Sequence, residues 1–387
     1  MRVDRPLRDV PAHAGDLLDA LPAALDGTGP ALRALDPDVP RGHEAPRTVP
    51  DGTALVVRTS GSTGRSRDVV LGADALRASA AATAARLGGP GRWLLALPVH
   101  HVAGLQVLVR ALLAGHAPHV LGTGPFRAEG FRAAVDALGT DLPRYTSLVP
   151  TQLVRVLDDE AATGAARTFD AILVGGAATS PTLLARARAA GVRVVTTYGM
   201  TETCGGCVYD GVALDGVQVD VDAEQRVSLT GPVLATGYLG RPDLDATTFV
   251  TQRGARWLRT ADRGRVVDGR LQVLGRLDDV LVSGGVKVDP QAVEAVVAAH
   301  PHVREVCVVG VPDQHWGQCV VAVVVTSDGA APPLQDLRTS VAAALGPASA
   351  PRQVVVVDAL PLRGPGKPDR RAAARLAVER QALGPPA

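Results

Sequence analysis

Residues 53–64 read TALVVRTSGSTG, in which a short apolar segment runs directly into hydroxyl residues and two glycines. A strand that ends in such a loop can surround an anion with backbone N–H groups and hydroxyls. No Gly-Lys-Ser/Thr follows, so the loop is not a Walker A motif. A flexible surface turn is the alternative interpretation. The candidate anion-binding residues are Thr59, Ser60, Gly61, Ser62, Thr63 and Gly64.

Strand-like and helix-like segments alternate on the C-terminal side of this loop. Expected strands are 53–59, 93–97, 144–149, 171–174 and 192–196, and expected helices are 73–87, 103–114, 130–138, 151–158 and 181–190. Such alternation indicates a parallel sheet covered by helices. Between about 213 and 273, short strands and turns such as 226–230 and 271–274 predict a smaller β subdomain. Residues 1–50 show only one short apolar segment, at 17–25.

A second unit begins near Asp278. Apolar periodicity predicts helices at 290–299 and 334–345 and strands at 304–311, 319–326 and 353–358. The predicted fold class is therefore α/β, with a large N-terminal domain of helix-covered sheets plus a β subdomain (1–277). A small, mobile α+β C-terminal domain (278–387) follows it across a short hinge.

Composition narrows the class of protein. The formal net charge is +1 over 387 residues, so no binding to nucleic acid or to membrane surfaces is expected. The most apolar region, 93–115, contains His100, His101, Gln106 and Arg110 and is too polar to span a membrane. The N-terminus lacks an apolar signal-peptide segment. We therefore expect a cytoplasmic protein.

Lysine is almost absent: Lys287 and Lys367 are the only lysines among 40 Lys and Arg residues. Both lie in glycine-rich loops near the C-terminus. Lysine carries a compact charge on a flexible stem, which arginine does not replace where one atom must be reached. An arginine-biased composition that left two lysines behind is the alternative.

The cysteines Cys204 and Cys207 have CxxC spacing. A zinc site would need a second pair or suitably spaced histidines, and neither is present. We expect these residues to pack beside a pocket.

Three further groups carry chemistry. His100-His101 lies at a strand-to-helix junction, where histidines are often structural. Residues 197–203 (TYGMTET) place an aromatic ring, hydroxyls and a carboxylate in one loop, which could also be a helix N-cap. A carboxylate beside phosphates commonly holds Mg²⁺. Asp262 and Arg276 suit ribose hydroxyls, or alternatively a surface turn and an ion pair.

The order of these groups resembles the adenylate-forming superfamily of acyl-CoA synthetases, adenylation domains and luciferases. Residues 59–64 look like its phosphate loop, 198–202 like its Tyr-Gly-x-Thr-Glu motif, and 260–262 like its Thr-Gly-Asp motif. Residues 275–290 look like its hinge, and Gly366-Lys367 like its catalytic lysine loop. The resemblance covers about 53–376. The runs 97–112 and 198–211 further resemble the short actinobacterial o-succinylbenzoate–CoA ligases.

The resemblance implies an AMP-forming acid–CoA ligase that uses ATP, Mg²⁺ and CoA and acts through an acyl-adenylate. The phosphate loop would bind the β- and γ-phosphates, Glu202 the Mg²⁺, and Lys367 the reacting carboxylate and α-phosphate. His101 would line the acyl pocket, and Lys287 would face the site after domain rotation. The remaining implied site residues are Gly175, Gly176, Ala177, Tyr198, Gly199, Thr201, Asp262 and Arg276.

Some features stay open at the level of sequence. The phosphate loop continues Arg65-Ser66-Arg67-Asp68 where the family has Gly-x-Pro-Lys-Gly, so Asp68 is expected to bring a negative charge near the phosphates. Alternatives are a ligase for another acyl or aryl acid, or a degenerate nucleotide-binding homologue. A homodimer is possible. Candidates to bind a carboxylate of the substrate are Arg92, Arg144 and Arg193.

Overall fold

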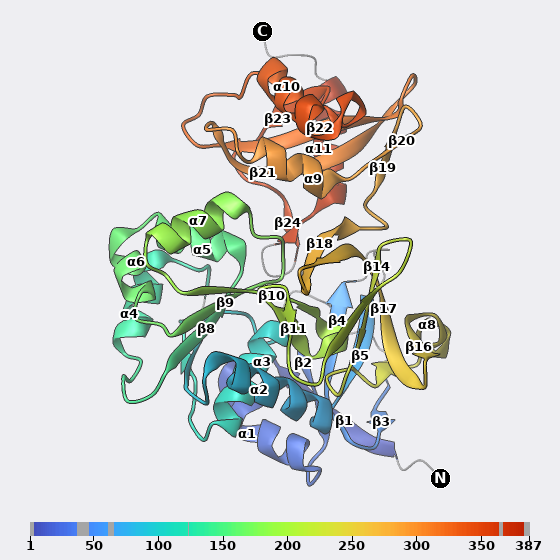
Figure 1. Cartoon of the computed structure of the whole chain (residues 1–387). Coiled ribbons are helices and arrows are strands. Elements are labelled where there is room, and N and C mark those ends of the chain that lie inside the picture. The colour runs from blue at the N-terminus through green and yellow to red at the C-terminus, as the bar shows by residue number, and fades with distance from the viewer. Residues whose placement is uncertain (1–3, 37–45, 61–65, 123, 364–366, 383–387) are drawn as a thin grey trace.

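The computed structural model describes residues 4–36, 46–60, 66–122, 124–363 and 367–382 (Figure 1). The candidate phosphate-loop residues Gly61, Ser62, Thr63 and Gly64, and Gly366 of the lysine loop, lie outside the described residues. The predicted fold class is confirmed: helices and several sheets form a large N-terminal part, and a smaller α+β unit follows.

The first sheet contains the strand that precedes the phosphate loop. Its order is β15-β5-β4-β2-β1-β3. The elements are β1 (Asp4–Pro11), α1 (Ala14–Asp26), β2 (Ala31–Leu35), β3 (Thr48–Pro50), β4 (Thr53–Ser60), β5 (Ser66–Gly72) and β15 (Gly237–Tyr238). The sequence did not predict β1 and β2. Buried Arg5 stabilises this region by donating to carbonyls of Ala24 and Thr53, a long-range arrangement without a periodic signal.

The second sheet has the order β12-β11-β10-β9-β8-β6-β7, and β6 to β10 run parallel where they pair. Its strands are β6 (Arg92–Leu95), β7 (His119–Val120), β8 (Arg144–Leu148), β9 (Ala171–Val174), β10 (Val194–Met200), β11 (Gly205–Tyr209) and β12 (Val212–Ala213). The helices are α2 (Ala73–Leu87), α3 (Val102–Leu113), α4 (Ala128–Asp136), α5 (Pro150–Leu157), α6 (Glu160–Ala166) and α7 (Pro181–Ala189).

Alternation along β6 explains why helices cover both faces of this sheet. Trp93 and Leu95 join the cluster that includes Leu76 of α2, while Leu94 joins the one that includes Phe131 of α4. A strand buried on both faces reads as a continuous apolar run, as parallel strands do. The predicted parallel sheet is therefore present, with the antiparallel strands β11 and β12 at one end.

The β subdomain has the order β13-β14-β17-β16, and β18 pairs with β17. Its elements are β13 (Gln218–Val221), β14 (Arg226–Thr230), α8 (Pro242–Thr248), β16 (Phe249–Gln252), β17 (Ala255–Val267) and β18 (Arg270–Arg276). Its long β17–β18 hairpin places Asp262 opposite Arg276 in register.

The C-terminal unit has its own sheet, in which β20-β19-β22-β21 is joined by β23. Its elements are β19 (Leu281–Ser283), β20 (Val286–Val288), α9 (Pro290–Val297), β21 (Val303–Asp313), β22 (Gly317–Thr326), α10 (Leu334–Leu345), β23 (Gln353–Val356), β24 (Leu362–Arg363), β25 (Lys367–Pro368) and α11 (Arg370–Ala382). Figure 1 shows this unit above the rest of the chain, with β18 leading toward it. Among the described helices, none is long and apolar enough to cross a membrane.

Candidate active site

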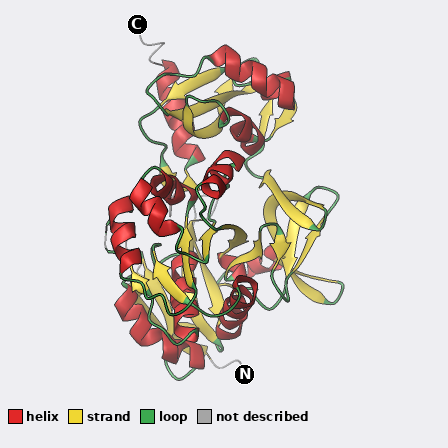
Figure 2. Ribbon diagram, turned by 60° about the vertical axis from the view of Figure 1, so that its left-hand side comes forward, coloured by secondary structure: helices red, strands yellow, loops and turns green. Residues whose placement is uncertain are grey.

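The motif residues gather at one edge of the second sheet. The carboxyl ends of parallel strands meet at a common edge, which is where open α/β sheets bind ligands. His101 follows β6, Gly175 follows β9 and Tyr198 lies near the end of β10. Figure 2 shows the smaller unit, near the C-terminus, above the helices and strands of the large domain. The fold thus brings together groups that lie about a hundred residues apart in the sequence.

Glycine at the end of β9 is required by a close approach to β10. A Cβ added at Gly175 would lie 2.2 Å from Oγ1 of Thr197, and Gly176 has a φ of +82°. Gly199 sits at a β-bulge, where an added Cβ would lie 2.1 Å from the carbonyl oxygen of Gly205. At Gly175 and Gly199 the close approach of neighbouring strands admits no side chain, so only backbone is present there. Such a surface suits a flat ligand such as a base.

Glu202 is held by a tyrosine that the sequence did not single out. It lies in a single 3-10 turn, Thr201–Thr203, directly after β10. The hydroxyl of Tyr238 in β15 donates a 2.8 Å hydrogen bond to Oε1 of Glu202. Burial and this carboxylate raise the pKa of Tyr238, so the phenol remains a donor at neutral pH. The guanidinium of Arg67 lies 5.7 Å from the centre of the Tyr238 ring.

Asp262 connects the second sheet to the β subdomain. Its Oδ2 accepts a 2.8 Å hydrogen bond from the hydroxyl of Tyr198, and its Oδ1 accepts one of 3.3 Å from Nη1 of Arg276. Burial and the adjacent Asp262 carboxylate raise the pKa of the Tyr198 phenol. Asp262 is largely buried, and these two donors offset the cost of burying its carboxylate. The sequence prediction that Tyr198, Asp262 and Arg276 belong to one site agrees with this geometry.

Asp68 does not stand as an unpaired charge at the phosphate loop. Thr59 and Ser60 end β4, and their partners across the hairpin are Arg67 and Ser66. One residue further on, Asp68 accepts hydrogen bonds from Arg58 at 2.8 and 3.0 Å and pairs with Arg33 at 3.1 Å. Burial alone would raise the pKa of Asp68, but the two arginines outweigh it and lower this pKa. The expected negative charge is therefore compensated within the sheet.

The two lysines lie in the C-terminal unit. Lys287 is exposed on β20, away from the β10 edge (Figure 1), and Lys367 pairs through its backbone with Arg363. His101 caps α3 with extended backbone, and its ring centre lies 4.2 Å from that of His100. The structure therefore brings His101, Glu202 and Asp262 to one edge but places Lys287 elsewhere. Its role after domain rotation stays a prediction.

Cys204 and Cys207 lie in the core beside the Glu202 turn. Both are fully buried with free thiols, and burial raises the pKa of Cys207 to about 12. The carbonyl of Cys204 accepts hydrogen bonds from Ser79 at 3.2 Å and from Gln106 at 2.8 Å. These contacts tie the turn to α2 and α3.

The N-terminal part matches a family model described as "AMP-binding enzyme" over residues 9–238. The chain belongs to the AMP-binding enzyme family. The family's C-terminal domain model matches residues 292–367. The match begins at residue 9 rather than near 53, and β1 and β2, which precede residue 53, belong to the same sheet as the phosphate-loop strand β4.

Members of this family from several bacteria are similar to the chain. A probable 2-succinylbenzoate–CoA ligase of Mycobacterium tuberculosis is 46% identical over 371 residues, which are 93% of this chain and 94% of the relative. A 2-succinylbenzoate–CoA ligase of Escherichia coli is 34% identical, over 77% of this chain and 64% of the relative. A solved Escherichia coli MenE variant with bound OSB-AMS has a TM-score of 0.77 at 26% identity, covering 97% of this chain and 88% of that one.

Proposed function

We propose that the chain is an AMP-forming acid–CoA ligase acting on o-succinylbenzoate. The carboxylate attacks the α-phosphate of ATP to give an acyl-adenylate and diphosphate. The thiol of CoA then attacks the acyl carbon, and AMP leaves. The observation that carries this proposal is 46% identity over nearly the full length of both this chain and the probable 2-succinylbenzoate–CoA ligase of Mycobacterium tuberculosis.

The residues at the β10 edge suit a nucleotide. Asp262, oriented by Tyr198, would accept hydrogen bonds from ribose hydroxyls, and the glycine turn after β9 would lie against adenine. Arg276 keeps its charge, because the carboxylates of Asp278 and Asp262 outweigh the effect of burial and raise its pKa. Charge placed where phosphates react contributes through position and preorganisation.

Glu202 fits the requirement of Mg²⁺ for hard oxygen ligands, since this ion is commonly held by one or two carboxylates together with substrate phosphates. When bound there, Mg²⁺ would neutralise phosphate charge. Tyr238 fixes the orientation of the carboxylate from outside, as partners of metal ligands commonly do. The location of Arg67 on β5 next to Tyr238 would add a second positive group near the phosphate loop.

A buried arginine of α3 contacts two aromatic side chains. Arg110 of α3 is 7% exposed, its Nε has no hydrogen-bond partner, and its Nη2 makes only a long 3.4 Å contact to the Tyr209 hydroxyl. No Asp or Glu of the described chain forms an ion pair with it. Its guanidinium also lies 5.2 Å from the centre of the Trp93 ring, and this cation–π contact offsets part of the cost of burying the charge.

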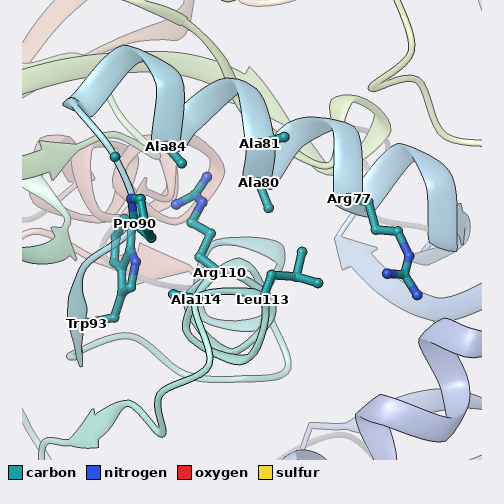
Figure 3. Close-up of a pocket in the computed structure, with 10 residues that line it drawn as sticks. Arg77, Ala80, Ala81, Ala84, Pro90, Trp93, Arg110, Leu113 and Ala114 are labelled. Carbon is teal, nitrogen blue, oxygen red and sulfur yellow. The ribbon is translucent and has the colours of Figure 1, made fainter.

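Arg110 lies in the last turn of α3, at the opposite end of the helix from His101, and the cavity beside it is lined by Pro90 and Trp93 near the start of β6. Gln106, one turn earlier on the same face of α3, bonds to Cys204 beside the Glu202 turn, and His101 caps the same helix. Figure 3 shows the Arg110 side chain extending from α3 toward α2, over a cavity of about 300 Å³ that Trp93 also lines.

The arginines that the sequence suggested for binding a carboxylate of the substrate already have partners within the protein. Arg92 forms two hydrogen bonds with Asp141, and Arg193 donates to the Phe169 carbonyl and pairs with Asp170. Both Nη atoms of Arg144 are bonded within the protein. These side chains therefore stabilise the protein itself, and we do not assign them to the substrate carboxylate.

A substrate panel tests the function. AMP release with CoA should be high on o-succinylbenzoate and low on benzoate and on medium-chain fatty acids. ATP–diphosphate exchange separates a ligase from a degenerate nucleotide-binding homologue, and detection of the CoA ester separates it from an enzyme that stops at the adenylate. Equal turnover of benzoate would contradict the substrate and leave only the family.

Two further proposals concern the cellular location and the oligomeric state of the chain. We propose a cytoplasmic enzyme, because its substrates ATP and CoA are cytoplasmic molecules. A homodimer remains a proposal that light scattering can test.

A further inference from the structure

Arg370 lies three residues after Lys367 and makes contacts with three separate parts of the C-terminal unit. It is the first residue of α11. Its Nη1 and Nη2 bond to the two carboxylate oxygens of Glu294 in α9, and Nη1 also donates to the Val308 carbonyl of β21 at 2.7 Å. Its Nε donates to Oδ2 of Asp279 at 3.3 Å. One guanidinium therefore joins α9, β21 and the segment that enters the domain.

The backbone between Lys367 and Arg370 has little freedom. Lys367 is in β25, which pairs with β24, and the Asp369 amide donates to the Pro361 carbonyl at 2.8 Å. The Asp369 carboxylate caps α11 by accepting from the amides of Arg371 and Ala372, both at 3.0 Å. A displacement of Arg370 would therefore move the lysine strand with it.

Neighbouring carboxylates at the domain junction bind arginines on opposite sides. Asp278 accepts two hydrogen bonds, of 2.8 and 2.9 Å, from Arg276 at the end of β18. Asp279, the next residue, binds Arg370 in the smaller unit. The link between the N-terminal part and the lysine strand thus passes through Arg276, two adjacent aspartates and Arg370.

We infer that Arg370 is a positioning residue for the adenylation step, which rests on the proposed function. Its bond to Asp279 fixes the lysine strand relative to the junction, so that a change of backbone angles at Asp278 carries Lys367 as one rigid unit. Lys367 acts only in adenylation in the proposed cycle. Loosening the Asp279–Arg370 bond should therefore slow adenylation and spare thioester formation. A displacement of about 1 Å can cost on the order of 100-fold in rate.

The test uses three variants: Asp279→Asn, Arg370→Met and the double variant that combines them. The control is Arg371→Met, the same substitution at the exposed neighbouring arginine. Asp279→Asn leaves the Glu294–Arg370 pair intact. It therefore tests the inference even if Arg370→Met fails to fold. Both half-reactions are measured: ATP–diphosphate exchange, and CoA-ester formation from supplied acyl-adenylate. The acid used is whichever the wild-type protein adenylates, so failure of o-succinylbenzoate contradicts the proposed function alone.

We expect exchange to fall at least tenfold in Asp279→Asn and about 100-fold in Arg370→Met, mainly in kcat, while ester formation falls less than threefold. The double variant should be no slower than Arg370→Met, because the Asp279–Arg370 bond that Asp279→Asn weakens is already absent in Arg370→Met. Arg371→Met should behave as wild type. Equal loss in both half-reactions, multiplied losses in the double variant, or an unchanged Asp279→Asn would overturn the inference.

Discussion

Tyr238 and Glu202 are joined by a 2.8 Å hydrogen bond between strand β15 and the turn after β10. The donor is the tyrosine, because burial and the carboxylate raise the pKa of its phenol. The bond restricts the rotation of a carboxylate that we propose as the Mg²⁺ ligand. It also connects two sheets of the N-terminal part at the point where the phosphate-loop hairpin meets the second sheet.

Tyr238→Phe should weaken the use of Mg²⁺. Loss of a hydrogen-bond partner to a metal ligand commonly costs 10- to 100-fold in metal affinity or activity. We expect the Mg²⁺ concentration for half-maximal exchange to rise about tenfold, with little change in KM for the acid. Tyr145→Phe is the matched control, because that hydroxyl bonds the Leu87 and Gly89 carbonyls. An unchanged Mg²⁺ titration of Tyr238→Phe would contradict the assignment of Glu202.

Asp68→Asn should destabilise the protein in a pH-dependent way. Because the pKa of folded Asp68 is lowered, its stabilising contribution is present above the unfolded pKa of about 3.9 and is lost as pH falls through the folded pKa. We expect a loss on the order of 2 kcal/mol at pH 7 for this largely buried pair. The difference between the variant and wild type should shrink as the pH falls below about 3.9. Urea unfolding between pH 7 and 3 measures this.

Asp243→Asn is the control for that experiment. Its carboxylate, in the first turn of α8, forms a solvent-exposed pair with Arg241, and such pairs contribute little. The unfolding midpoint of this variant should match that of wild type at every pH. A constant difference between Asp68→Asn and wild type down to pH 3 would contradict the electrostatic explanation.

Local patterns were sufficient to predict most of the elements that form the site. Helix α2 was predicted residue for residue as 73–87, since an Ala-rich run is bounded by Gly72 and Gly88. Helix α10 was predicted equally well as 334–345. The motifs at the ends of β9 and β10 could be placed at one edge, because parallel strands leave no other arrangement for them.

Contacts between distant segments could not be predicted from the same patterns. Tyr238 binds Glu202 from 36 residues away, and Asp279 binds Arg370 from 91 residues away. Arg110 looks like any polar residue on an amphipathic helix, and only burial without a carboxylate distinguishes it. Asp68 was expected beside phosphates because nothing in the sequence reveals that β2 and β4 carry Arg33 and Arg58 to it.

Lys367→Ala should abolish adenylation and spare thioester formation from supplied acyl-adenylate. Lys367→Arg should also be badly impaired, because a planar fork does not reproduce the contact of a single ammonium. Lys287→Ala is the internal comparison: it should spare exchange and slow the thioester step. Exchange at a nearly normal rate by Lys367→Ala would remove this lysine from the catalytic assignment.

Asp278→Pro should separate the two half-reactions. The domain boundary at 277/278 remains a prediction, and Asp278 must change its backbone angles if the smaller domain rotates there. Proline fixes φ near −65° and restricts the residue before it. Loss of the Asp278 carboxylate would also release Arg276, which donates hydrogen bonds of 2.8 and 2.9 Å to it and also contacts Asp262.

We expect Asp278→Pro to form the adenylate and retain it, with exchange preserved and CoA-ester production lowered by a large factor. Asp278→Ala is the control for the lost carboxylate, since it removes the Arg276 contact without fixing the backbone. If Asp278→Ala reproduced the defect, the ion pair rather than the rotation would be responsible. A loss of both half-reactions in Asp278→Pro alone would indicate damage to folding, which thermal unfolding would reveal. If neither half-reaction changed, alternation of domains about Asp278 would be the wrong mechanism for this protein.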